Sequence, residues 1–255
     1  MLSIIIPSFK EPYLNKTIDN LLANATGEIE IIAVFDGYWP PTMKEDPRVH
    51  IIHFGQNKGL RAAINAGIAL AKGEYLMKID AHCTVGKGFD QILTKDLKDN
   101  WVVVPRRYKL DVEKWEVMPD QYVDYDKLII MESRHKFHAQ EWISRRKERK
   151  GKMVDETMSF QGSCWVMTRK HWDSVIKELQ EAGYGRFVQE AVEIGMKTFQ
   201  SGGKLMVNKN TWYAHKDRKF KRTHNITREE ADAGDTYSLG LWMNEYLKLK
   251  EYFRL

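Results

Sequence analysis

The chain has few cysteines and no long apolar run, and both absences limit what it can be. Only Cys83 and Cys164 occur among 255 residues, whereas small secreted domains held by disulfides carry more. No segment approaches the roughly 20 apolar residues of a membrane-spanning helix, and the N-terminal segment lacks the pattern of a signal peptide. These absences predict a cytoplasmic location without a membrane span.

Two sequence patterns are also missing. There is no Gly-x-Ser-x-Gly elbow, which argues against an α/β hydrolase, and there is no internal repeat. The composition that remains is 43% hydrophobic and 29% charged, with a formal net charge of +5. This is an ordinary globular composition with a mild preference for polyanionic partners.

Strand and helix patterns alternate along the first hundred residues. β-branched runs with turn signals at their ends predict strands, and apolar residues at helical spacing predict helices between them. This alternation predicts an α/β fold with a Rossmann-like, mainly parallel sheet and helices on both faces. The strand segments are LSIIIP, EIEIIAVFDG, VHIIHFG, EYLMKID and WVVVP, and the helical segments are EPYLNKTIDNLLANA, GLRAAINAGIALAKG and residues 88–97.

The pattern loosens after Pro105. Residues 106–160 show few strand signals and contain the charged stretch SRRKERKGKM, which is typical of a mobile loop or a basic surface. Further along, RFVQEAVEIGMKTFQ predicts a helix that ends at Gly202-Gly203, and a strand follows. We expect the last segment, TYSLGLWMNEYLKLKEYF, to be an amphipathic helix packed on the body.

Acidic residues come directly after two of the predicted strands. Asp36 ends one strand, and Asp80 ends another with His82 two positions further on. In an open parallel sheet, ligands bind beyond the carboxyl ends of the strands, so both carboxylates are expected in that crevice. The alternatives are an Asp-Gly turn at Asp36 and a helix cap or turn at Asp80.

The order of these motifs resembles the GT-A glycosyltransferases of the family 2 type. The segments that carry the resemblance are SIIIPSFKE, IIAVFDG and KGLRAAINAGIALAKGEYLMKIDAHC. Within them, DAHC is similar to the Asp-x-His-Cys of the polypeptide N-acetylgalactosaminyltransferases, and QEAVEIGMKTFQSGG is similar to their Glu-containing helix. The resemblance covers roughly residues 1–220. It implies a retaining hexosyl- or N-acetylhexosaminyltransferase with a UDP-sugar donor.

The resemblance divides the chain into three parts. It implies a nucleotide-sugar-binding half at residues 1–105 and an acceptor-side, metal-completing half of the same domain at 106–225. A C-terminal helical segment would then occupy residues 226–255.

The resemblance also implies a metal site. Asp80, His82 and His215 would hold Mn²⁺ or another divalent cation, with zinc or cobalt as alternatives. A packed histidine at a strand end is the alternative for His215. The contacts to UDP would come from Pro7, Asp36, Arg61 and Asp80.

Two carboxylates are the catalytic candidates. Glu190, with Glu193 one turn further on, matches the acidic helix of the resembling family. In an inverting enzyme Glu190 would take the acceptor's proton, and in a retaining enzyme it would position the sugar.

Aromatic and basic residues frame the acceptor. Trp165 and Trp212 are candidates for stacking on a sugar or a base. Arg145 and Arg146, with a second basic stretch that includes Lys219, Lys221 and Arg222, fit a polyanion such as DNA with hydroxymethylated bases. The alternative acceptor is a glycan or protein hydroxyl, and the alternative for the basic stretches is a solvated loop. The alternative function is that of a non-catalytic module that binds nucleotide or nucleic acid.

Overall fold

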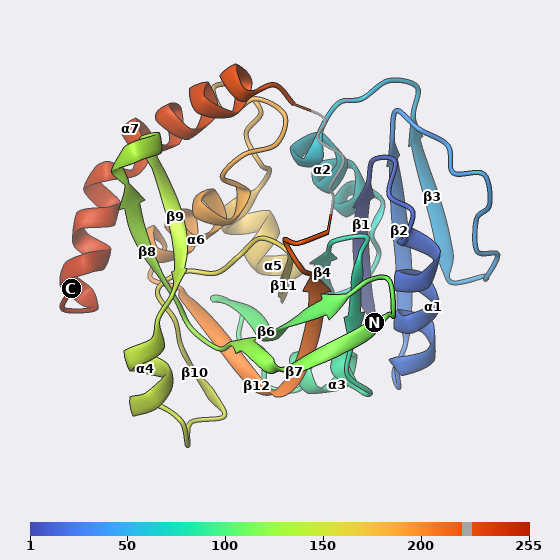
Figure 1. Ribbon diagram of the computed structural model, residues 1–255, viewed down its shortest axis with the longest axis horizontal. Helices are drawn as coiled ribbons and strands as arrows, with labels where there is room; N and C mark the ends of the chain where they lie inside the picture. The colour runs from blue at the N-terminus through green and yellow to red at the C-terminus, as the bar shows by residue number, and fades with distance from the viewer. Residues whose placement is uncertain (221–225) are drawn as a thin grey trace.

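The computed structural model describes residues 1–220 and 226–255, and a large twisted sheet runs through its centre (Figure 1). Within the described residues this sheet has ten strands, eight of them in the order β10-β12-β6-β11-β4-β1-β2-β3, while β5 pairs with β12 and β7 with β6. The bounds are β1 (Leu2–Ser8), β2 (Ile29–Asp36), β3 (Val49–Phe54), β4 (Tyr75–Ile79), β5 (Cys83–Val85), β6 (Trp101–Asp111), β7 (Glu116–Val123), β10 (Val154–Glu156), β11 (Cys164–Thr168) and β12 (Lys204–Lys216).

The sheet is mainly parallel, as the sequence predicts. β4, β1, β2 and β3 pair in parallel, and so do β6 and β12. β11 lies antiparallel between β4 and β6. All eight positions of β2 are buried, because a parallel strand is covered on both faces and therefore reads as a continuous apolar run.

Helices cover both faces of the sheet. Ile5 of β1 shares a core cluster with Ile64 of α2, whereas Ile4 and Ile6 share another cluster with Ile18 of α1. Alternate residues of a strand point to opposite faces, so α1 and α2 pack on opposite sides. The helices are α1 (Leu14–Asn24), α2 (Leu60–Leu70), α3 (Phe89–Thr94), α4 (Ile143–Glu148), α5 (Arg169–His171), α6 (Glu190–Gln200) and α7 (Arg228–Tyr252), with a 3₁₀ turn at Glu132–Arg134 and a π-helical turn at Trp172–Ile176.

Residues 106–160 are richer in strands than the sequence indicates. β6 continues to Asp111, and β7, β8 (Asp126–Met131), β9 (Lys136–Glu141) and β10 follow it. The expectation of few strands was wrong because these are edge or hairpin strands: β7, for example, has no buried position and carries little apolar signal.

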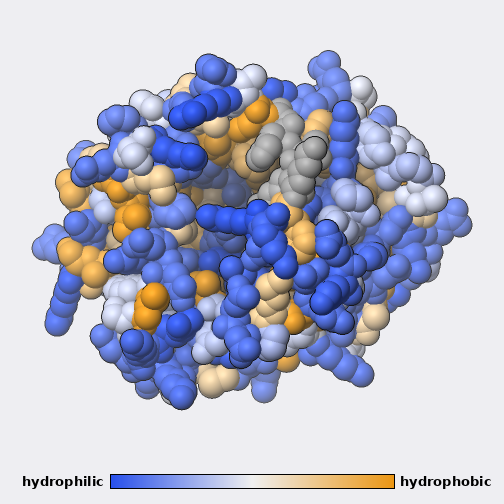
Figure 2. Space-filling view, viewed as in Figure 1, coloured by the Kyte–Doolittle hydropathy of each residue, from blue (hydrophilic) through white to orange (hydrophobic). Residues whose placement is uncertain are grey.

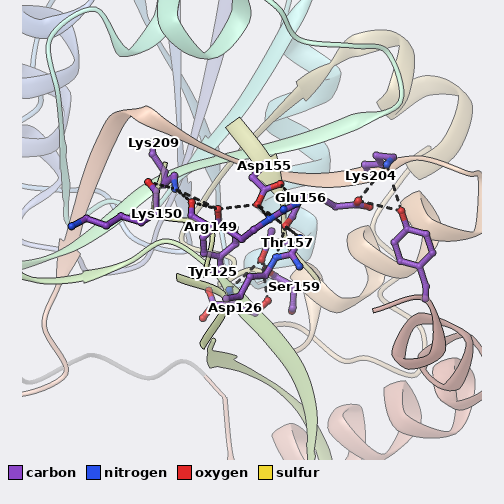
Figure 3. A network of polar contacts seen from close by, with 12 residues as sticks. Tyr125, Asp126, Arg149, Lys150, Asp155, Glu156, Thr157, Ser159, Lys204 and Lys209 are labelled. Carbon is purple, nitrogen blue, oxygen red and sulfur yellow. Dashed lines mark hydrogen bonds and ion pairs between the residues drawn. The ribbon is translucent and has the colours of Figure 1, made fainter. Parts of the chain in front are cut away.

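The basic stretch around α4 is ordered by contacts within the chain, and it is not a free loop (Figure 3). Arg145 donates from Nη2 to the carbonyl oxygen of Glu156 at 2.7 Å. Arg149 Nε and the Tyr125 hydroxyl both donate to Asp155 Oδ2 at 3.0 Å. Lys209 Nζ donates to the carbonyl oxygen of Arg149 at 2.9 Å. Part of the positive charge that suggested a polyanion surface therefore holds α4 against β10 and β12.

The last helix packs on the body, as expected. In Figure 1, α7 runs beside the β8–β9 hairpin. Its buried residues Trp242, Tyr246 and Leu249 belong to the core cluster that also contains Ile194 of α6. In the part of the chain that the structure describes, no helix has both the length and the apolar character needed to cross a membrane.

Candidate functional site

Three predicted metal ligands converge beyond the end of β4. Asp80 follows β4, His82 precedes β5, and His215 lies on β12 opposite Cys83 in the antiparallel β5–β12 pair. His215 Nε2 is 3.1 Å from Asp80 Oδ2 and 3.1 Å from His82 Nε2. One candidate ligand atom from each residue lies within 4.8 Å of the others. A carboxylate oxygen and two imidazole nitrogens at this spacing form a donor set suited to a divalent transition metal.

Glu11 orients one of these ligands. Its Oε2 lies 2.8 Å from His82 Nδ1, so a protonated Nδ1 donates to the carboxylate and leaves the Nε2 lone pair toward Asp80 and His215. Carboxylate partners of this kind commonly fix the tautomer of a metal-binding histidine. Sequence reasoning missed Glu11, and the available signal was an acid three residues beyond the first strand.

A buried lysine holds the Asp80 carboxylate. Lys78 Nζ lies 2.5 Å from Asp80 Oδ1 and 3.7 Å from Glu190 Oε1. Burial opposes the charge on Lys78, but Asp80 and Glu190 outweigh this effect and raise its pKa. Burial likewise opposes the charge on Asp80, yet Lys78, His215 and His82 outweigh it and hold the pKa of Asp80 well below its usual range. Asp80 is therefore an anion at neutral pH.

Glu190 begins α6 and is buried beside this pair. Its Oε1 accepts from Trp165 Nε1 at 3.3 Å, and a Cβ on Gly162 would stand only 2.1 Å from its Oε2. Burial raises the pKa of Glu190, because its effect is larger than the opposing effect of the Lys78 charge. Trp165 itself is fully buried and stacks on Trp172. The expectation that Trp165 contacts an acceptor is thereby corrected: it supports Glu190 from inside the core.

Arg61 and Glu193 are placed as a structural pair. Both are buried, and the guanidinium of Arg61 forms an ion pair with Glu193. Arg61 also donates from Nη2 to the carbonyl oxygen of Val188 at 2.7 Å and from Nη1 to that of Gln180 at 2.8 Å. These contacts occupy the guanidinium and fasten α2 to α6. The nucleotide contact expected of Arg61 and the catalytic role expected of Glu193 are therefore corrected, because neither side chain is exposed.

Asp36 organises the loop before α2. Its carboxylate accepts from Asn57 Nδ2 at 2.6 Å and from the backbone N–H groups of Lys58 and Gly59 at 2.5 and 2.8 Å. The Asp-Gly turn that was its alternative role is also present, with Gly37 at φ +72°. Asp36 therefore shapes the cavity wall as well as lining it.

A cavity of about 410 Å³ joins the predicted nucleotide and metal residues. It extends from the ends of β1 and β2 past Asp80, His82 and His215 to α6 and α7, and Figure 2 shows this face of the molecule hollowed near its centre. Its lining includes Pro7, Asp36, Asp80, His82, Glu190, His215, Lys136, Gln189 and Asp235.

A second cavity, of about 510 Å³, shares His215 and Gln161 with the first. Arg146 lines it and donates to the carbonyl oxygen of Tyr122 at 2.9 Å. Trp212 instead packs edge-on against Tyr108, with ring centroids 5.9 Å apart. Of the predicted acceptor residues Trp165, Trp212, Arg145 and Arg146, the structure thus brings Arg146 to a cavity wall. Lys221 and Arg222 lie outside the described residues.

A mainly parallel sheet with helices on both faces and a polar cavity beyond its strand ends is typical of a GT-A domain. The family model described as glycosyl transferase family 2 matches residues 3–176, and the chain belongs to this family. Its fold is similar to the crystal structure of GalNAc-T7 with UDP, GalNAc and Mn²⁺, with a TM-score of 0.77, 20% sequence identity, and coverage of 96% of this chain and 49% of that one.

Two curated relatives are similar over part of their length. The uncharacterized glycosyltransferase EpsJ of Bacillus subtilis (strain 168) is 35% identical over 108 residues, which make up 39% of this chain and 31% of the relative. The glycosyltransferase GlyG of Streptococcus pneumoniae serotype 4 (strain ATCC BAA-334 / TIGR4) is 30% identical over 121 residues, or 44% of this chain and 40% of the relative. The matched regions therefore span less than half of each relative.

Proposed function

We propose that this protein is a metal-dependent glycosyltransferase that moves a sugar from a UDP-sugar to an acceptor hydroxyl. The observation that carries the proposal is the convergence of Asp80, His82 and His215 on the wall of the 410 Å³ cavity. The family to which the chain belongs and the UDP and Mn²⁺ in the similar GalNAc-T7 structure support it.

The residues present fit a divalent cation such as Mn²⁺. The set offers one carboxylate oxygen and two imidazole nitrogens, and Glu11 orients His82. When bound, the cation would neutralise the charge that develops on the diphosphate as the sugar departs. Lys78 keeps Asp80 ionised and in place, because it is buried against that carboxylate.

The remaining cavity residues would contact different parts of the donor. Pro7 and the Asp36-organised loop border the part of the cavity formed by the ends of β1 and β2, which suits a nucleoside. Glu190 lies on the same wall as Asp80 and would position the transferred sugar. In keeping with the Asp-x-His motif, we take the reaction to retain the anomeric configuration.

The acceptor enters, in this proposal, through the 510 Å³ cavity that shares His215 with the donor cavity. A glycan or protein hydroxyl is favoured over a hydroxymethylated base in DNA, because Arg145 is bound to the carbonyl oxygen of Glu156 and Arg146 pairs with Glu141 at 2.8 Å. A groove that binds the phosphate backbone of DNA needs lysine or arginine side chains that are available to contact the phosphate groups.

Release of UDP from a panel of UDP-sugars, with Mn²⁺ and with EDTA, tests the donor half of the proposal. We expect release from at least one donor in Mn²⁺ and its loss in EDTA. Equal release in EDTA would refute metal dependence, and a donor bound without release in either condition would favour a non-catalytic nucleotide-binding module.

Acceptor preference is measured with labelled donor. The arms are simple glycans, peptides, 5-hydroxymethylated DNA and plain DNA, each at low and physiological salt. Label on glycans or peptides without retention of DNA supports the favoured acceptor. Label on hydroxymethylated DNA with steep salt dependence would restore the DNA acceptor.

A further inference from the structure

The C-terminal helix supplies a buried carboxylate to the donor cavity. Asp235 of α7 is 3% exposed and lines this cavity together with Gln189 and Lys136. Gln189 Nε2 donates to Asp235 Oδ1 at 2.5 Å, and Lys136 Nζ lies 3.5 Å from Asp235 Oδ2. A carboxylate, an amide and an ammonium group from three separate segments thus meet at one wall of the cavity.

The backbone at Gln189 is held in an unusual conformation. Gln189 has φ +60° and ψ +22°, in the left-handed region, and directly precedes Glu190. A residue other than glycine is strained in this conformation and keeps it only where its surroundings fix it. The contacts that fix it are those of the side chain to Asp235 and to the carbonyl oxygen of Phe137, the latter at 3.1 Å.

The chemistry of this wall matches a polyol. A carboxylate accepts hydrogen bonds from hydroxyl groups, an ammonium donates to them, and an amide does both. Asp235 is buried and Lys136 is partly exposed, and an ion pair of this kind adds little net stability, so stability alone gives little reason for a charged pair at this point. A site built to bond a hydroxyl also rejects a substrate that lacks it there, because its own polar groups are then left unpaired.

We propose that Lys136, Gln189 and Asp235 form the wall that selects the transferred sugar by the orientation of its hydroxyl groups. This inference rests on the proposed function. Gln189 and Asp235 lie beyond residues 3–176, where the family model matches, so membership of the family assigns them no role.

The test compares donors that differ at one hydroxyl. The ratio of kcat/KM for UDP-glucose to that for UDP-galactose, and the same ratio for the N-acetylated pair, is measured for the wild type, Asp235→Asn and Lys136→Met. Asp232→Asn is the matched control, since Asp232 is on the same helix but exposed. Calorimetric Kd values for the same donors in Mn²⁺ give a second ratio that does not depend on turnover.

We expect both substitutions to change an epimer ratio about 10- to 100-fold, the range of one hydrogen bond to a charged group. The affinity of these variants for UDP should equal that of the wild type, and the control variant should keep the wild-type epimer ratios. A uniform loss for both epimers, with ratios unchanged in both measurements, would overturn the inference by reducing the wall to a structural role. If the wild type binds donors but releases no UDP, the proposed function fails. A shifted Kd ratio in Asp235→Asn would still support sugar selection in that case.

Discussion

His82 and His215 face each other through their Nε2 atoms at 3.1 Å, although 133 positions separate them in sequence. The pairing of β5 with β12 produces this approach, because it sets His215 opposite Cys83 and lets Lys216 N–H donate to the carbonyl oxygen of His82 at 3.1 Å. Two imidazole nitrogens directed at each other beside a carboxylate are a donor set that could hold a cation.

Removing either histidine should remove metal binding. We expect His82→Ala and His215→Ala to lose Mn²⁺ affinity in titration calorimetry and to lose Mn²⁺-stimulated release of UDP, because two ligands remain of three. His53→Ala is the control, since His53 is exposed on β3. Unchanged Mn²⁺ affinity in both variants would show that the cluster is not a metal site.

Glu11→Gln should weaken the metal site without abolishing it. The amide keeps the size of the side chain but no longer offers a carboxylate to His82 Nδ1, and the loss of such a partner typically costs 10- to 100-fold in metal affinity. The apparent Mn²⁺ affinity of the variant measures this. An affinity equal to that of the wild type would contradict the role of Glu11.

Asp36→Ala should weaken the binding of UDP more than it slows turnover at saturating donor. The substitution releases three hydrogen bonds that hold residues 57–59, so the nucleoside end of the cavity loses its shape while the metal cluster stays intact. Calorimetry with UDP, beside kcat at saturating donor, checks this. Asp46→Ala is the control, because the partner of Asp46 is the exposed Arg48. An unchanged UDP affinity would leave Asp36 with the turn-forming role only.

Glu193→Ala should destabilise the fold by about 3–5 kcal/mol, because it leaves the buried charge of Arg61 without its carboxylate. Urea unfolding measures the change, and the double variant Arg61→Met with Glu193→Leu should recover much of the loss. A variant that keeps wild-type stability but loses activity would instead support a direct role of Glu193 in catalysis.

Acid should destabilise the protein partly through His171. Its Nε2 lies 2.9 Å from Thr198 Oγ1, and burial lowers its pKa below the usual 6.5. Because the folded state disfavours the proton, the stabilising contribution is present above pH 6.5 and is lost as the pH falls through the lowered pKa. In denaturant unfolding between pH 7 and 5, His171→Gln should lose less stability than the wild type. Parallel pH curves for the two proteins would contradict this, and His53→Gln on exposed β3 controls for loss of a histidine.

The strand-end positions of Asp36 and Asp80 were predictable because their signals are local. Asp36 and Asp80 are strand-end residues, and the strands before them are apolar runs whose direction follows from the alternation with helices. The orientation of Arg61 could not be predicted in this way. Its partner Glu193 lies 132 positions away and is one of several acids available, and a charged side chain gives no sequence signal of burial.

The structure after Pro105 was harder to predict for a related reason. Trp165 carries the same sequence signal whether it stacks on a ligand or on Trp172, and only the packing of β11 against α6 and its neighbours decides between them. Strands β7 to β10 lie at edges or in a hairpin, where one face of a strand can stay polar.

The late position of β12 in the chain has a consequence for biosynthesis. Asp80 leaves the ribosome 135 residues before His215, which at about 5–20 residues per second is roughly 7–27 seconds. During that interval the nascent chain would carry two of the three proposed ligands, Asp80 and His82, without His215. At the proposed metal site, cation capture would therefore follow the docking of β12 against β5, and a bound ion would report that this long-range strand pairing has closed.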